Sequence, residues 1–79
     1  MNLTHLTKNL DHPLDDFEEL ESRLRDKLRG RICDFRLLPL ESGIILRGFA
    51  RTYYAKQLAQ HTVQTETTIP ILANEIEVS

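Results

Sequence analysis

The stretch LLPLESGIILRGFARTYY, residues 37–54, decides the fold. Glu41-Ser42-Gly43 separates two apolar runs, and a three-residue turn that contains glycine is typical of a β-hairpin. Thr52 follows the second run, at a position where the N-cap of a helix is expected. The stretch therefore predicts a strand, a turn, a second strand and the start of a helix.

Size and composition indicate one small folded domain. The chain has 79 residues, of which 41% are hydrophobic and 28% charged, as in ordinary globular domains. With 10 basic and 12 acidic residues, no global field favours nucleic acid or anionic lipid. No apolar run approaches the ~18 residues of a membrane span, and residues 1–10 lack the apolar core of a signal peptide. We expect a cytoplasmic protein, or a periplasmic one if a leader has been removed.

The N-terminal part is predicted to be a flexible lead-in over residues 1–12, followed by a single domain over residues 13–79. A helix is expected from Pro13 to about Arg29, because its apolar residues recur at steps of three and four. Gly30 comes next and can adopt the left-handed conformation that ends a helix. The stripe consists of Leu14, Phe17, Leu20 or Glu21, Leu24 and Leu28.

The charges of this helix are sorted, with acidic residues first and basic residues last, which complements the helix dipole. Pairs four residues apart, Glu19 with Arg23 and Glu21 with Arg25, are expected to cancel most of the basic field. Three less compensated arginines remain as candidates for an anionic ligand: Arg29, Arg31 and Arg36.

Alternation assigns inner and outer faces to the hairpin strands. In the first strand, over residues 32–40, Cys33, Phe35 and Leu37 are expected to face the core. Cys33 is the only cysteine, so it forms no intramolecular disulfide, and we interpret it as a small packed residue. In the second strand, over residues 44–50, the inner face carries a glycine, Gly48. This indicates close approach of a helix backbone or a β-bulge.

The rest of the chain predicts one more helix and one more strand. The helix is expected over residues 53–64, with its buried side made by Tyr54, Ala55, Leu58, Ala59, Thr62 and Val63. Pro70 prevents its continuation. The last strand is expected over residues 71–78, with one side made by Leu72, Asn74, Ile76 and Val78.

The predicted fold class is therefore α+β, with the order α-β-β-α-β and two helices packed on one face of a three-stranded mixed sheet. The other face of the sheet is left uncovered. Such residues can simply be tolerated at a surface, or they can form a partner-binding or self-association surface. The residues expected there are Arg36, Leu38, Ile45, Arg47, Phe49 and Ala73.

The chain resembles the BON domain, a bacterial module named for osmotic-shock and nodulation-specificity proteins. The resemblance covers residues 20–78. It rests on Leu46-Arg47-Gly48 at the end of a strand, on the alanine-containing helix that follows, and on LANEIEV, residues 72–78, in the last strand.

The resemblance implies a non-enzymatic module that binds a membrane surface, phospholipid or another macromolecule, in some relatives during envelope or osmotic stress. It implies no catalytic residue, metal or cofactor, since the matched positions are architectural. As partner-binding residues we therefore name the outward-facing and less compensated positions Arg36, Ile45, Arg47, Phe49, Arg29 and Arg31.

Two alternatives stay open. The order of elements is similar to that of the KH domain, which binds single-stranded nucleic acid, but the Gly-x-x-Gly loop of that family is missing. A homodimer through the exposed sheet face, with no small ligand, is the other alternative. An enzyme is disfavoured, because there is no glycine-rich phosphate loop and the histidines His5, His12 and His61 are scattered.

Overall fold

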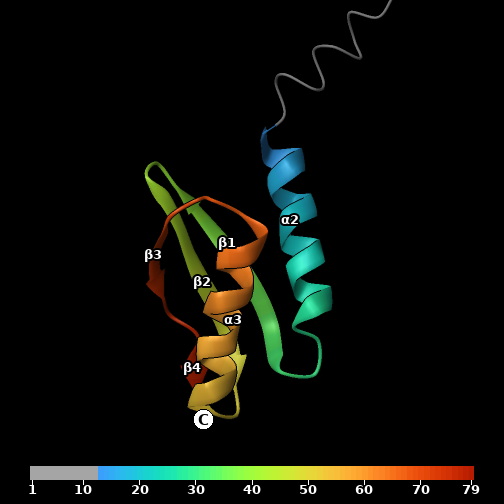
Figure 1. Ribbon diagram of the computed structural model, residues 1–79, viewed down its shortest axis with the longest axis vertical. Coiled ribbons are helices and arrows are strands. Elements are labelled where there is room, and N and C mark those ends of the chain that lie inside the picture. Colours follow the sequence, from blue (N-terminus) through green and yellow to red (C-terminus); the bar gives the residue numbers. More distant parts are fainter. Residues whose placement is uncertain (1–12) are drawn as a thin grey trace, which may run out of the picture.

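A computed structural model describes residues 13–79, and the side chains from residue 16 onward (Figure 1). The predicted lead-in, with His5 and His12, lies outside the described residues, as does the side chain of Leu14. The elements are α2 (Pro13–Lys27), β1 (Ile32–Leu40), β2 (Gly43–Ala50), α3 (Tyr53–Glu66), β3 (Ile71–Asn74) and β4 (Glu77–Val78). The α+β class and the predicted element order are confirmed, except that the last strand is in two pieces.

Helix α2 ends at Lys27, two residues before its predicted end, and Gly30 lies in the turn that follows. Gly30 has a φ of 85°, in the left-handed region that a glycine adopts without steric cost. The N–H groups of Arg31 and Ile32 donate to the carbonyl of Leu28 at 2.9 and 3.0 Å. The chain thereby reverses into β1, and the buried leucines of α2 come to lie against the strand.

The hairpin turn has two residues rather than the predicted three. Leu40 pairs with Gly43, so Gly43 is the first residue of β2 and only Glu41 and Ser42 form the turn. A Cβ atom at Gly43 would lie 2.5 Å from the carbonyl oxygen of Pro70 and 2.8 Å from Cγ of Leu72. The glycine is thus required by the close approach of β3, not by the turn.

A β-bulge in β1 changes which residues reach the core. Cys33 pairs with Phe49 and Arg36 pairs with Arg47, so two residues of β1 oppose one residue of β2. Asp34, inside the bulge, has a φ of 53°. The predicted packing of Cys33 is wrong, because the bulge turns its side chain outward and it is exposed. Ile32 is buried in its place, whereas Phe35 and Leu37 are buried as predicted.

Gly48 is explained by the same bulge. Its φ is 148°, and a Cβ atom there would lie 2.9 Å from Cγ2 of Ile32 and 3.0 Å from the carbonyl oxygen of Cys33. These atoms belong to β1. Of the two predicted reasons for this glycine, the bulge is confirmed and the approach of a helix is not the cause.

Helix α3 begins at its predicted cap and ends two residues later than predicted, at Glu66. Oγ1 of Thr52 accepts a hydrogen bond from the N–H of Ala55 at 3.0 Å. The buried side chains are Ala55, Ala59 and Val63. Tyr54 lies one position off this stripe and is 67% exposed, so its predicted burial is wrong.

The last strand divides into β3 and β4, which both pair parallel with β2, so the sheet formed by residues 13–79 has four strands rather than three. The strand β3 has one extra residue here. Ile71 pairs with Ile44 and Ala73 pairs with Ile45, so the residue between them has no partner in β2. This irregularity leaves Leu72 exposed, contrary to its predicted place beside Asn74 and Ile76.

Asn74 stabilises the break between the two strands. Its Nδ2 donates to the carbonyl oxygen of Lys56 at 3.1 Å and to Oε1 of Gln60 at 3.3 Å, and its Oδ1 accepts from the N–H of Ile76 at 3.2 Å. The side chain thereby ties the strand ends to α3 and directs Ile76 into the core, where it is 1% exposed.

Both helices pack against one face of the sheet, as predicted. Figure 1 shows α3 in front of β1 and β2, with α2 alongside it over the β1 edge. One continuous cluster of buried side chains joins the two helices to the sheet. It contains Leu20, Leu24 and Leu28 from α2, Ala55, Ala59 and Val63 from α3, and Ile32, Phe35, Leu37, Ile44, Leu46, Ala50 and Ile76 from the sheet side.

Candidate functional site

The face of the sheet opposite the helices, called here the outer sheet face, brings together four of the six predicted binding residues. Arg36 on β1 lies directly opposite Arg47 on β2. Ile45 lies between its partners Leu38 on β1 and Ala73 on β3. Phe49, further along β2, has Glu77 of β4 as its neighbour. The predicted composition of this face is therefore supported by the strand register.

One half of this face, near the hairpin turn, is apolar. It consists of Leu38, Leu40, Ile45, Leu72 and Ala73. Leu38 is 39% exposed, Leu40 48% and Leu72 44%. Large side chains in this state retain much apolar surface in water, and a contiguous group of them marks an interaction site more often than a scattered one does. We call these residues the apolar half.

The other half is charged and hollowed. An open hollow of about 420 Å³ is lined by Asp34, Arg36, Arg47, Gly48, Phe49, Glu75 and Glu77. We call its six residues other than Gly48 the charged half. Nε of Arg47 lies 3.0 Å from Oε1 of Glu75, so this arginine is already paired. Two arginines face three carboxylates here, and the charged half as a whole is slightly acidic.

Arg36, the other arginine of this face, forms no ion pair with any side chain that the structure describes. It stands opposite Arg47, and like charges directly opposite on neighbouring strands are unfavourable. Glu75 offsets the charge of Arg47 but does not pair with Arg36. A carboxylate supplied from outside the chain would therefore find its best partner at Arg36.

Arg29 and Arg31 do not belong to this face, because they lie in the turn between α2 and β1. Nη2 of Arg29 contacts Oδ1 of Asp26 at 2.7 Å, so this guanidinium is less available to an external anion. Arg31 is exposed just before Ile32, whose partner in the sheet is Ala50.

Arg51 follows Ala50, so it is at the same end of the sheet as Arg31 and is also exposed. The exposed Tyr53 and Tyr54 begin α3 here, and no acidic residue lies in the first turn of that helix. We call Arg31, Arg51, Tyr53 and Tyr54 the basic end. Sequence reasoning missed Arg51 and the tyrosines, because only the strand pairing brings residues 31 and 51 to one place.

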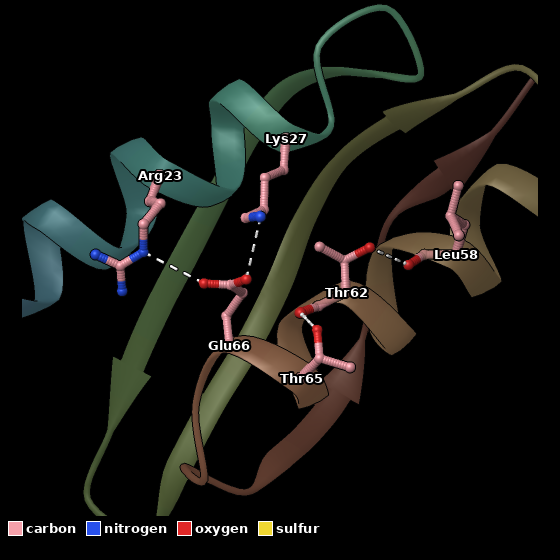
Figure 2. A network of polar contacts seen from close by, with 6 residues as sticks. All are labelled: Arg23, Lys27, Leu58, Thr62, Thr65 and Glu66. Atoms are coloured by element: carbon pink, nitrogen blue, oxygen red, sulfur yellow. Dashed lines mark hydrogen bonds and ion pairs between the residues drawn. The ribbon is translucent and has the colours of Figure 1, made fainter.

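A third polar group joins the two helices. Figure 2 shows the carboxylate of Glu66, in the last turn of α3, between Arg23 and Lys27 of α2. Nε of Arg23 and Nζ of Lys27 each lie 3.3 Å from one of its oxygens. The hydrogen bond from Lys27, followed by that from Arg23, lowers the pKa of Glu66 against the opposing effect of desolvation.

This contact corrects one predicted pair, since Arg23 reaches Glu66 and not Glu19, whereas Arg25 pairs with Glu21 as expected. A hollow of about 380 Å³ lies beside the contact, and both Arg23 and Glu66 line it. Because these two charges bind each other, they serve the packing of α2 on α3.

The described side chains contain no group of three or more His, Cys, Asp or Glu residues placed to hold a metal ion. None of the helices within residues 13–79 has the length and apolar character needed to cross a membrane.

The chain matches no protein-family model, and no curated protein or solved structure is significantly similar to it.

Sequence reasoning did not include Glu75 and Glu77 in the candidate face. The signal was present, because alternation places both residues on the side of Ala73 in the last strand. What was missing was the register of that strand on β2, which puts Glu75 beside Arg47.

Proposed function

We propose that this chain is a small non-enzymatic binding module of BON-like type that engages a protein surface through its outer sheet face. The observation that carries the proposal is the uncovered apolar half, in which Leu38, Leu40 and Leu72 remain exposed beside Ile45. Both helices lie on the other side of the sheet, so within residues 13–79 nothing shields these side chains from water.

The chemistry of the charged half supports a protein surface more than a lipid surface. A membrane with anionic headgroups attracts a surface of one sign, whereas this face presents Asp34, Glu75 and Glu77 beside its two arginines. Protein interfaces instead combine apolar residues with polar residues of both signs. The outer sheet face has this composition, in two adjoining halves.

Phe49 and Arg36 are the expected anchors of the interface. Phe49 is 47% exposed and lies on β2, the strand between β1 and β4, where a partner can cover its ring. Aromatic and arginine side chains supply a large share of binding energy at protein interfaces, especially where water is excluded around them. Removal of either should therefore weaken binding more than removal of a rim carboxylate.

The test uses the immobilised chain and an extract of the cells that express it. Proteins retained in stoichiometric amounts are identified for the parent chain, for Phe49→Glu, and for Gln64→Glu as a control that adds the same charge at an exposed position of α3. We expect retention by the parent and the control and its loss with Phe49→Glu. Equal retention by all three would exclude the outer sheet face as the binding surface.

An anionic phospholipid surface is a second candidate, favoured by the basic end. Arg31 and Arg51 are exposed at one end of the sheet, next to two exposed tyrosines. Arginine provides charge for phosphate groups, and tyrosine has the amphipathic ring that prefers the headgroup region. Binding through this end is consistent with the envelope-associated role that the BON resemblance implies.

Vesicle co-sedimentation tests this candidate. Vesicles of phosphatidylcholine alone are compared with vesicles that also contain phosphatidylglycerol, and we expect binding to the second kind only. Arg31→Glu and Arg51→Glu should remove it, whereas Arg47→Glu, a reversal of the same charge on the outer sheet face, should leave it in place. Loss with Arg47→Glu but not with the other two would contradict the assignment to the basic end.

A further inference from the structure

The outer sheet face is complementary to itself in one orientation. Its apolar half and charged half occupy successive rows along the strands, so they do not intermix. Across the strands, the guanidinium of Arg36 lies on the β1 side and the carboxylate of Glu75 lies on the β3 side, with Arg47 between them. A surface with this layout meets two requirements of a symmetric interface, a separate apolar patch and opposite charges on its two lateral sides.

We compare two two-fold axes through the middle of this face that could place it on a second copy of itself. The axis that runs across the strands would lay the apolar half on the partner's charged half and bury carboxylates against leucine. An axis along β2 lays the apolar half on its own counterpart, and exchanges the β1 side for the β3 side. Of the two, the second arrangement covers Leu38 and Ile45 with apolar groups. In it Arg47 faces its own counterpart near the axis, and Glu75 of the same chain remains its partner.

The inference rests on the proposed function and names its partner. We propose that the outer sheet face binds the same face of a second copy of this chain, about a two-fold axis that runs along β2. The two sheets then pack face to face with their strands nearly aligned, about 10 Å apart, as the two layers of a β-sandwich do. Each sheet then covers the outer sheet face of the other copy.

The axis along β2 brings Arg36 of one subunit across from Glu75 of the other, twice in each dimer. Glu75 is already bound by Arg47, but a carboxylate accepts several hydrogen bonds and can bridge two arginines. Asp34 and Glu77 lie at the end of the sheet, past Arg36 and Arg47, so they fall at the solvated rim where like charges are screened.

The oligomeric state is the first test. Light scattering after size-exclusion chromatography should give twice the chain mass of 9.2 kDa for the parent. Leu38→Asp, which places a charge in the apolar half, should give the mass of one chain, while Gln64→Glu on α3 should leave the dimer in place. A parent that is monomeric at several hundred micromolar would overturn the inference.

A charge exchange tests the axis itself. Arg36→Glu should be monomeric alone, because glutamate then faces Glu75 of the partner subunit, and Glu75→Arg should be monomeric alone because arginine faces arginine. An equimolar mixture should form a heterodimer, since both cross-subunit contacts then join opposite charges. Native mass spectrometry with one variant ¹⁵N-labelled identifies this species, and circular dichroism verifies that both variants are folded.

A mixture that stays monomeric, or single variants that dimerise as strongly as the parent, would overturn the two-fold axis along β2. The proposed function fails separately. If the parent is monomeric yet retains another protein that Phe49→Glu loses, the outer sheet face is still a binding surface and only the second copy is excluded. If the parent is monomeric and retains nothing, both are wrong.

Discussion

Single residues at the bulge of β1 decide what the outer sheet face presents. The extra residue puts Cys33 and Asp34 at the surface and returns Phe35 to the core, so that Arg36 falls opposite Arg47. Gly48 makes this possible, since no side chain fits between β2 and the bulged backbone. The chemistry of the face therefore depends on a residue that contributes no side chain to it.

Gly48→Ala should lower the free energy of unfolding by at least about 2 kcal/mol, because the new Cβ atom meets the bulge and the backbone conformation favours glycine. Gly30→Ala is the matched control, since its φ is also positive but no atom lies within 4 Å of the added group. It should cost about 1 kcal/mol, from the backbone alone. Urea denaturation measures both, and equal losses would show that the bulge is not tightly packed on Gly48.

At the scale of elements, the edge strand β1 is protected along its open side. The N–H of Leu37 points away from β2 and donates to Oε2 of Glu21 on α2 at 2.8 Å. Pro39 follows two residues later, in the same orientation, and has no N–H to expose. Exposed edge donors invite pairing with another strand, so this arrangement directs association away from the edge and toward the sheet face.

Glu21→Ala should cost about 1–2 kcal/mol, because it leaves the half-buried N–H of Leu37 without an acceptor. Glu19→Ala, on an exposed position of the same helix, should stay within about 0.5 kcal/mol of the parent. Chemical denaturation of both variants decides the matter. A loss shared by the two would mean that helix charge, and not the bond to β1, is responsible.

The contact between α2 and α3 predicts a specific dependence on pH. Because Lys27 and Arg23 lower the pKa of Glu66 in the folded state, the stabilisation is present above the ordinary glutamate pKa of about 4.3 and is lost as pH falls through the lower folded value. Glu66→Gln should therefore melt at a lower temperature than the parent at pH 7, and the difference should shrink as the pH falls below the ordinary glutamate pKa. A difference that stays the same as the pH falls would contradict this origin.

The same elements show how far the sequence alone could predict the fold. The hydrophobic periods of α2 and β2, the cap at Thr52 and the stop at Gly30 are local signals, and the structure confirms them. The errors at Cys33 and Leu72 have one cause. Each lies at an irregularity in strand pairing, which depends on contacts between segments distant in sequence and shifts the alternation on which the prediction relied.

At the scale of the whole molecule, one layer of helices covers one face of a sheet whose other face has apolar residues. So small a chain buries a modest share of its surface, and its stability is correspondingly limited. Covering Leu38, Leu40 and Ile45 with a second sheet would add apolar burial at about 25 cal/mol per Å². We therefore expect folding and association to be thermodynamically linked.

This linkage predicts a melting temperature that rises with protein concentration. Above the dissociation constant, a tenfold increase in concentration stabilises each chain of a dimer by about 0.7 kcal/mol, which corresponds to roughly 3–5 °C for a domain of this size. Leu38→Asp should abolish the dependence, since a monomer melts at the same temperature at every concentration, whereas Gln64→Glu should retain it. Calorimetry over two decades of concentration makes the comparison, and a parent whose melting temperature stays constant would show that the outer sheet face is not covered by a second copy.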